Sequence, residues 1–219
     1  RDEKLIWPVV EAMASTETLF FRDRTPFDQL RNDILPVLAR SRQDSIRIWS
    51  VGCATGQEPY SLAMLVDEER GAHAGLKVDL FASDLSERCL EKAHSGLYTQ
   101  FEVQRGLPSR LLIKYFEKID DAWVLSPRIR QMVRWRRVNL IGDLKPLGQF
   151  DVIFCRNVLT AFDDSTRKSV LEQLALALTD DGFLMLGLNE TVTGLTHAFR
   201  PVAGRRGLYI RNPQHRAAA

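Results

Sequence analysis

The stretch IRIWSVGCATGQEPYSLAM, residues 46–64, decides the fold class of this chain. Residues 46–51 look like a buried strand, and a loop with two glycines follows them. Pro59 then marks the expected start of a helix, because proline is favoured at the first helical position, where its missing N–H costs nothing. A strand that passes through a glycine loop into a helix predicts a nucleotide-like ligand at the end of the strand.

Strands and helices alternate through most of the remaining chain. Further strands are expected at residues 77–83, 150–155 and 183–188, and helices at 26–40, 87–94 and 166–178. With right-handed crossovers, this alternation predicts an α/β fold with a mainly parallel, doubly wound, Rossmann-like sheet. A turn is expected at 180–182, and Pro36 is expected to kink the first of these helices. The closing residues 199–211 predict an antiparallel hairpin around Gly204 and Gly207.

Residues 99–138 do not follow the alternation. They contain a helical pattern, LLIKYF (111–116), and two strand-like pieces around 123–125 and 133–138. We expect a small inserted β-subdomain there, bounded at about residues 99–132. Residues 1–25 contain an amphipathic segment at 3–14 and precede the first helix expected in this alternation. Residues 26–219 would then be the main domain.

Composition excludes several classes of function. The chain has 219 residues, 45% of them hydrophobic, and a net charge of +2, so it can bury a full core and is not a nucleic-acid coat. No apolar run approaches the roughly 20 residues that cross a membrane, and there is no signal peptide. Three cysteines without metal-ligand spacing predict reduced thiols in a cytoplasmic protein and no metal site. The four histidines form no catalytic cluster in the sequence.

The glycine loop is not built for a pyrophosphate. Gly52 and Gly56 allow close approach of the backbone to a ligand, but Ala54 breaks the GxGxxG fingerprint and no lysine follows Gly56 as in a P-loop. Asp84 ends the second strand, where an acid accepts the hydroxyls of a ribose. A ribose without phosphates fits S-adenosylmethionine (SAM), whose ammonium group Glu58 could meet.

Each of these features also has a purely structural interpretation. Two glycines in a strand-to-helix turn often serve packing alone. Asp84, before Leu-Ser-Glu, could equally cap the following helix, because a carboxylate satisfies free amides there. It is the combination of the loop with the acid, at Rossmann-like spacing, that favours a SAM site.

Six strings of the sequence together resemble one known family. They are TETLFFRD (16–23), WSVGCATGQEPYSLA (49–63), FASDLSERCLEKAHSGLY (81–98), VNLIG (138–142), FDVIFCRNVL (150–159) and FRPVAGRRGLYIR (199–211). In this order they resemble the CheR family, the chemotaxis-receptor methyltransferases, over nearly the whole chain. The resemblance implies a linker helix and a cofactor-contacting segment in residues 1–25 and a SAM-dependent methyltransferase domain in residues 26–219, and we expect the given sequence to lack the family's N-terminal helical domain. The resemblance implies a SAM-dependent protein-glutamate O-methyltransferase that acts on chemoreceptors in bacterial chemosensory signalling.

The resemblance also assigns roles to residues, motif by motif. Arg22 and Arg156 would be catalytic, since an arginine fork can hold the acceptor carboxylate at two points. A glutamate carboxylate, with a reference pKa of about 4.3, is already ionised and needs no general base. The cofactor-binding set would be Thr16, Thr18, Arg22, Gly52, Glu58, Asp84, Asn139, Leu140, Arg156 and Asn157.

Two positions depart from the family pattern. Thr16 replaces the asparagine that opens the linker motif, and Ala161 replaces a tyrosine that borders the methyl-transfer site. The loss of this aromatic wall leaves two interpretations open. The chain is either a working methyltransferase or a CheR-like module that binds SAM or S-adenosylhomocysteine, or docks on a receptor, with little turnover. A small-molecule or RNA methyltransferase on the same fold is a third class.

The expected partners are the cytoplasmic signalling helices of chemoreceptors. The segment 128–137 carries five arginines, which form either a solvated strand face or a basic surface that attracts an acidic receptor helix. Nucleic acid is not expected, because Trp135 is the only aromatic residue in that segment. The turn at 117–122 lacks the glycine with which relatives grip a receptor-tail pentapeptide, so no such tether is expected. We further expect a monomer that does not insert into membranes.

Overall fold

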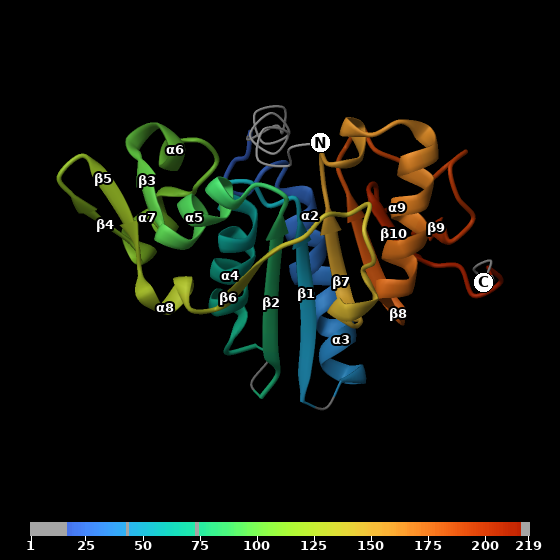
Figure 1. Ribbon diagram of the computed structural model, residues 1–219. Coiled ribbons are helices and arrows are strands. Elements are labelled where there is room, and N and C mark those ends of the chain that lie inside the picture. Colours follow the sequence, from blue (N-terminus) through green and yellow to red (C-terminus); the bar gives the residue numbers. More distant parts are fainter. Residues whose placement is uncertain (1–16, 43, 73–74, 216–219) are drawn as a thin grey trace, which may run out of the picture.

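A seven-stranded sheet forms the centre of the computed structural model, which describes residues 17–42, 44–72 and 75–215. Its order is β6-β2-β1-β7-β8-β10-β9 (Figure 1). The strands are β1 (Ser45–Val51), β2 (Lys77–Asp84), β6 (Val133–Arg137), β7 (Phe150–Cys155), β8 (Leu178–Leu186), β9 (Phe199–Pro201) and β10 (Leu208–Arg211). From β6 to β8 all neighbours pair in parallel, and β10 pairs antiparallel with β8 and β9. The predicted mainly parallel sheet with its C-terminal hairpin is confirmed.

The strand order reverses between β1 and β7. From β1 the chain proceeds outward to β2 and β6, and then returns to β7 on the other side. At such a switch point the loops after the two central strands diverge and leave a crevice, where open α/β sheets bind their ligands. The loops after Val51 and Cys155 therefore flank the expected site.

Helices cover both faces of the sheet. The helices on the two faces and in the connections are α2 (Thr25–Gln29), η1 (Leu30–Ile34), α3 (Leu35–Ser41), α4 (Gln57–Glu69), α5 (Glu87–Ser95), η2 (Lys145–Leu147), η3 (Leu159–Ala161) and α9 (Asp164–Ala177). Alternate residues of β1 enter different cores: Ile46 and Ile48 pack with α2 to α4, whereas Trp49 and Val51 pack with α9. This division is what the two-residue side-chain period of a strand dictates in a doubly wound sheet.

The helical stretch expected at 26–40 is interrupted at its centre. The N–H of Leu35 donates to the carbonyl of Leu30, one residue further back than in an α-helix, so η1 is a π-turn. Pro36 follows directly and has no N–H with which to continue the ladder. The disturbance expected from Pro36 therefore takes the form of a π-turn that ends beside it.

Strand β8 differs from the expected turn at 180–182. The strand is continuous over Leu178–Leu186, but its register against β7 jumps from Phe150↔Leu178 to Val152↔Phe183. Residues 179–182 therefore bulge out of the ladder instead of ending it. The residues Asp180, Asp181 and Gly182 do interrupt the pairing with β7. They lie within the strand, however, so the prediction of a separate turn before it was wrong.

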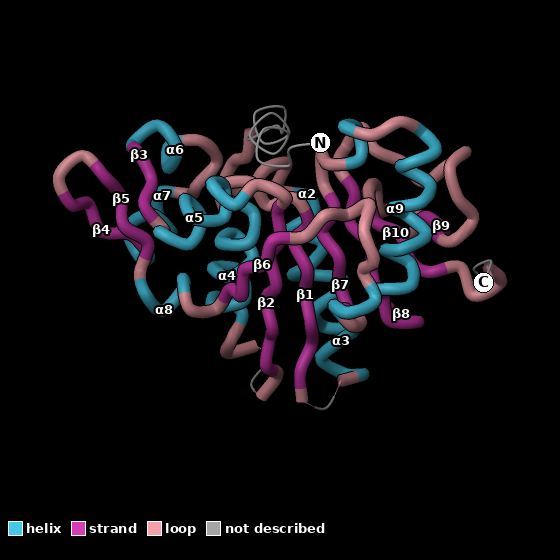
Figure 2. The backbone as a smooth tube through the Cα atoms, viewed as in Figure 1, coloured by secondary structure: helices cyan, strands magenta, loops and turns pink. Residues whose placement is uncertain are grey.

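A second, small sheet stands beside the main one (Figure 2). It contains β3 (Leu97–Thr99), β5 (Ala122–Leu125) and β4 (Phe116–Ile119) in that order, with α6 (Gln100–Gln104), α7 (Ser109–Tyr115) and α8 (Pro127–Arg130) around it. The strand-like piece at 123–125 belongs to this sheet. The piece at 133–138 does not: it forms β6, which pairs in parallel with β2 at the edge of the main sheet. This strand lies beyond the expected end of the insertion at about residue 132, and its pairing partner β2 is distant in sequence.

The linker joins the small sheet to the main domain through Phe20. This buried ring lies edge-on to Tyr98 at 5.1 Å and to Phe116 at 5.7 Å between ring centroids. A side chain at Gly106 would collide with the Phe20 carbonyl, because the linker backbone at Phe20 packs directly against Gly106. Only glycine fits at this position. The Tyr98 hydroxyl donates to the carbonyl of Thr55, 2.9 Å away, in the glycine loop. Linker, insertion and glycine loop thus form one packed unit.

Charged side chains fix α7 to the end of α4, which predicts a loss of stability in acid. Burial opposes ionisation of Glu68, but hydrogen bonds from Lys114, Arg110 and Tyr115 outweigh it and lower the pKa of Glu68 to about 2. Because the folded-state pKa lies below the ordinary value of 4.5, this contribution is present above pH 4.5 and is lost as the pH falls toward 2. Glu68→Gln should cost about 1–2 kcal/mol in urea unfolding at pH 7. The difference should shrink toward pH 2, and an equal difference at both pH values would contradict the assignment.

Candidate functional site

The glycine loop has three residues with positive φ angles, and one of them, Ala54, is not a glycine. Gly52, Ala54 and Gly56 all have positive φ angles, of 61°, 46° and 94°. A Cβ at Gly52 would lie 2.6 Å from Cγ2 of Val158, and one at Gly56 would lie 2.8 Å from Cβ of Ala93. Both glycines are therefore required by close packing as well as by φ. Helix α4 begins at Gln57, two residues before the expected start at Pro59.

Asp84 holds this loop against the end of β2. Its Oδ2 accepts from the backbone N–H of Ala54 at 2.8 Å, and its Oδ1 accepts from the N–H of Ser86 at 2.9 Å. The N-cap of α5 is Ser86, whose hydroxyl accepts from the N–H of Cys89, so the alternative of Asp84 as the cap was wrong. Since an ionised carboxylate offers about four acceptor positions, two remain for the hydroxyls of a ribose.

A buried ion pair lies at the floor of the crevice. Glu58 accepts from the hydroxyl of Ser50 and from Nη1 of Arg156, each at 2.8 Å. Burial raises the pKa of Glu58, although Arg156 and Ser50 oppose the shift. The side chain of Arg156 is only 1% exposed. A buried acid whose burial outweighs the effect of its own partners favours a further cation, such as an ammonium group.

Arg156 of this ion pair also binds the linker. Nη2 of Arg156 donates to the carbonyl of Arg22 at 2.8 Å and to Oδ2 of Asp23 at 2.6 Å. Phe21, Asp23 and Arg24 have positive φ angles of 48°, 66° and 35°. Non-glycine residues in this region cost about 1–3 kcal/mol each and persist where the surroundings hold them in place. The linker is thus held in a strained path over the crevice.

These elements enclose a cavity of about 420 Å³, which is within the range of about 300–1,000 Å³ for small-molecule sites. Its lining is Glu17, Thr18, Leu19, Arg22, Gly52, Cys53, Ala54, Glu58, Arg156, Asn157, Thr160, Ala161 and Asn189. Six of the residues expected to bind cofactor, Thr18, Arg22, Gly52, Glu58, Arg156 and Asn157, are in this set. Ala161 also lines it, so the position that departs from the family lies at the cavity.

The other expected cofactor residues lie beside or beyond the cavity. Asp84 reaches it through the lining residue Ala54, as described above. The N–H of Val138 donates to the carbonyl of Asp84 at 3.0 Å, which brings the following Asn139 and Leu140 to the same side. Asn139 is exposed, whereas the side chain of Leu140 is buried in the core, so only its backbone is available to a ligand. Thr16 lies outside the described residues.

Several residues of the site were not expected from the sequence. Ser50 and Asp23 complete the ion-pair network around Glu58 and Arg156, and Asn189 lines the cavity. Glu190 is 8% exposed and accepts three backbone N–H groups beside the cavity. For Asn189 and Glu190 the available signal was their position soon after the buried end of strand β8, because the carboxyl ends of parallel strands share one edge. Ser50, within β1, and Asp23, in the linker, carry no such signal.

A cysteine lies at the cavity, and potential metal ligands occur in the described part of the chain. Cys53 lines the cavity, but burial raises the pKa of its thiol, which keeps it from acting as a thiolate nucleophile. Among the described residues, no group of three or more His, Cys, Asp or Glu could hold a metal ion. None of the described helices has the length and apolar character of a membrane span.

The arginine-rich segment 128–137 is partly neutralised within the chain. Arg128 pairs with Asp67, Arg134 with Asp79, and Arg137 with Glu87. Three of its five arginines therefore already have acidic partners. This favours the interpretation of a solvated face over that of a strong basic docking surface.

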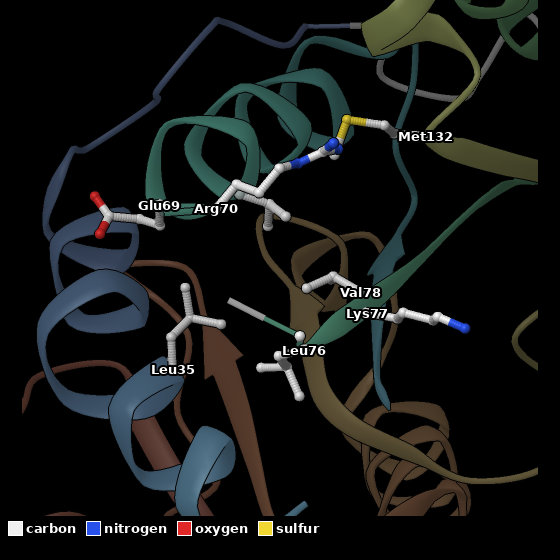
Figure 3. Close-up of a pocket in the computed structure, with 9 residues that line it drawn as sticks. Leu35, Glu69, Arg70, Leu76, Lys77, Val78 and Met132 are labelled. Carbon is white, nitrogen blue, oxygen red and sulfur yellow. The ribbon is translucent and has the colours of Figure 1, made fainter. Parts of the chain in front are cut away.

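A second cavity, of about 450 Å³, lies where α4 ends and β2 begins. Figure 3 shows Leu35, Leu76 and Val78 at its walls, with the carboxylate of Glu69 and the ammonium of Lys77 directed away from its centre. Among the described residues, its lining includes Gly75 and Glu69 but no counterpart of the buried Glu58–Arg156 ion pair, and the cavity does not lie at the switch point of the sheet. The cavity at the switch point is therefore the candidate active site.

The fold and the site together define a class. A reversed parallel sheet, a glycine loop without pyrophosphate features, an acid at the end of β2 and a buried acid at the floor are the features of SAM-dependent methyltransferases. The residues fit SAM, because the cavity size, the acid for a ribose and the buried acid for an ammonium are all present. Within the described part of the chain, the buried Nε of Arg156 has no hydrogen-bond partner, so a donor remains for a bound ligand.

Comparison with known proteins identifies the family. The family described as CheR methyltransferase, SAM binding domain, matches residues 16–208. "Chemotaxis protein methyltransferase Cher2" of Pseudomonas putida is 38% identical over 91% of this chain and 74% of its own length. "Chemotaxis protein methyltransferase 1" of Pseudomonas aeruginosa is 38% identical over 93% of this chain and 76% of its own length. A TehB-like SAM-dependent methyltransferase from Corynebacterium glutamicum aligns over 81% of this chain and 86% of that chain, with 15% identity and a TM-score of 0.46.

The chain belongs to the CheR methyltransferase family and contains its SAM-binding domain. The family resemblance and the cofactor predicted from the sequence are confirmed. The roles of individual residues and the domain boundaries stay predictions.

Proposed function

We propose that this protein transfers the methyl group of SAM to glutamate side chains of chemoreceptors. The observation that carries the proposal is the cavity at the switch point, which is lined by Glu58, by two arginines and by small residues, with Asp84 bonded to its lining residue Ala54. The relatives named as chemotaxis methyltransferases support the same setting. We place the reaction in the cytoplasm, on the signalling helices of receptors.

We assign some residues of the site to cofactor binding and others to the acceptor carboxylate. Bound SAM supplies an electrophilic methyl group on its sulfonium. Glu58 would face the ammonium group and Asp84 the ribose hydroxyls, while Gly52 would let the backbone approach the cofactor. Arg22, whose side chain is more accessible than that of Arg156, holds the acceptor carboxylate, and Arg156 holds Glu58 and the linker in place.

This reaction needs positioning more than acid–base chemistry. The acceptor carboxylate is already ionised at neutral pH, so no general base is required. Holding nucleophile and methyl group in line can contribute about 7–11 kcal/mol. Placing the acceptor between Arg22, Thr160 and Ala161, which line one cavity, would supply this alignment.

The proposal is tested by transfer from methyl-labelled SAM to purified receptor. Glutamyl methyl esters are labile to base, so label on the receptor should be released as methanol at alkaline pH. Label that stays on the protein would show that another side chain was methylated. SAM binding in calorimetry without any transfer would favour the alternative, a SAM-sensing or docking module. Transfer to RNA or to a small molecule instead of receptor would place the protein in another class.

Ala161 allows the two interpretations of the site to be separated. It lines the cavity where the family carries a tyrosine, so Ala161→Tyr should return an aromatic wall and a hydroxyl beside the acceptor. We expect single-turnover transfer to rise about tenfold, since one well-placed hydrogen bond contributes roughly 1 kcal/mol or more. A rate that does not change would mean that the wall is supplied by other residues.

We propose that no receptor-tail pentapeptide binds to the small sheet. The connection between β4 and β5 consists of Asp120 and Asp121 alone, and Asp120 has a positive φ of 51°. This turn is acidic and short, which leaves no glycine-bearing loop to receive a peptide. Calorimetry with a receptor-tail pentapeptide should show no heat of binding at concentrations where SAM binds. Saturable binding would contradict the proposal.

A further inference from the structure

We propose that Glu190 is a positioning residue for methyl transfer, which holds the loop after β7 in place over the cofactor cavity. This inference rests on the proposed function. Glu190 does not line the cavity, so it acts through residues 157–161, three of which do: Asn157, Thr160 and Ala161.

The carboxylate of Glu190 joins two segments of backbone. Its Oε2 accepts from the N–H of Asn157 at 2.7 Å and from the N–H of Gly187 at 2.8 Å. Its Oε1 accepts from the N–H of Leu159 at 2.8 Å. Asn157 and Leu159 follow β7, whereas Gly187 follows β8. One side chain, 8% exposed, thus fixes the relative position of two strand ends at the cavity.

The carboxylate of Glu190 has room only because residue 187 is a glycine. A Cβ at Gly187 would lie 2.7 Å from Oε2 of Glu190 and 3.0 Å from the N atom of Asn157. The acid therefore occupies the volume that any other residue at position 187 would fill. Gly187 does not have a positive φ, so its small size, and not an unusual backbone, is what the position requires.

The loop that Glu190 holds is strained and tightly packed. Asn157 has a φ of 60°, which a non-glycine residue adopts only at a cost that its contacts must offset. The hydrogen bond from its N–H to Glu190 is such a contact. Val158, next in the chain, fills the space above Gly52 in the cofactor loop. Glu190 bonds the backbone of Asn157 and Leu159 but not Arg156, which is held by Glu58 and Asp23. A shift of residues 157–161 would therefore move the wall of the acceptor site while leaving Arg156, Glu58 and Asp84 in place.

This arrangement predicts a separation between cofactor binding and catalysis. In Glu190→Gln, one oxygen becomes an NH2 group, which must face at least one backbone N–H that it cannot accept from. Gly187→Ala displaces the carboxylate while keeping its charge. Both variants should bind SAM almost as tightly as the unchanged protein, but kcat for receptor methylation should fall about 100-fold, as expected for a displacement of about 1 Å. KM for the receptor should change much less than kcat.

Glu172→Gln is the matched control. Glu172 is also a partly buried acid, bonded to Thr196 and to Nε2 of His215, but it lies on α9 away from the cavity. Its variant should leave kcat unchanged. If Glu190→Gln loses SAM affinity, kcat and melting temperature together, Glu190 is a general structural residue and the proposal is wrong. Unchanged kcat in both Glu190→Gln and Gly187→Ala would equally overturn it.

Hydrogen exchange gives a readout that does not depend on turnover. In the protein without receptor, the amides of Asn157 and Leu159 should lose protection in Glu190→Gln, whereas amides in the centre of β7 should keep theirs. Unaltered exchange at both amides would overturn the proposal. If the unmodified protein transfers no methyl group to receptor, the proposed function fails, and the exchange result still decides whether Glu190 holds the loop.

Discussion

Replacing Arg156 by alanine should both destabilise the protein and abolish SAM binding. The guanidinium is 1% exposed and bonds to Glu58, to Asp23 and to the carbonyl of Arg22. Its removal leaves a buried carboxylate without its cation, which typically costs about 3–5 kcal/mol. For a chain of this size, that corresponds to a fall in Tm of roughly 6–20 °C. Burial already raises the pKa of Glu58, and the loss of Arg156 removes an interaction that opposes this rise, so protonation of Glu58 becomes easier and its attraction for the ammonium group of SAM weaker.

Binding and stability can be separated with two further variants. Arg156→Lys keeps the charge but not the fork, so it should recover part of the stability and little of the affinity. Arg42→Ala is the matched control, because Arg42 also bonds two carboxylates, Asp151 and Asp181, but does so away from the cavity. It should lower Tm without weakening SAM binding. SAM affinity that survives in Arg156→Ala at a temperature where the variant is folded would contradict the role assigned to Arg156.

The main sheet could be predicted because its signal is local. Strands β1, β2 and β7 lie within one residue of their expected limits, since each is an apolar run bounded by turn residues. Strand β6 could not be assigned to the main sheet, because nothing in VRWRR distinguishes an edge strand of that sheet from a strand of the insertion. Its position depends on pairing with Leu80 to Asp84, a contact between segments about 50 residues apart.

The site could be predicted only where the chemistry is carried by the residue type. Glu58 and Asp84 were proposed from their residue type, because an acid beside the glycine loop can meet an ammonium group and an acid at the end of β2 can meet ribose hydroxyls. These roles stay predictions. The strained backbone of Phe21, Asp23 and Arg24 has no sequence signal, since none of these residues favours a positive φ strongly enough to predict it. The path of the linker is set instead by long-range contacts, chiefly those of Arg156.

Asp84→Asn should weaken SAM and S-adenosylhomocysteine binding without unfolding the protein. The carboxylate already accepts from the N–H groups of Ala54 and Ser86, and its remaining acceptor positions are those proposed for the ribose. Asparagine has one oxygen, so it can keep the bond to Ala54 but must turn its NH2 group toward Ser86 and one ribose hydroxyl. Losing charge-assisted bonds of about 1.5–3 kcal/mol each should raise Kd for both ligands about 100-fold.

Asp79→Asn supplies the comparison on the same strand. Asp79 lies on β2 as Asp84 does, and it pairs with Arg47 and Arg134 instead of with the glycine loop. The same change of carboxylate to amide there should leave both Kd values unchanged in calorimetry, because Asp79 is not near the cavity lining. Equal affinity in Asp84→Asn and in the unchanged protein would mean that the ribose is held elsewhere. Equal losses in both variants would instead trace the effect to the strand, since only a distortion of β2 connects the two positions.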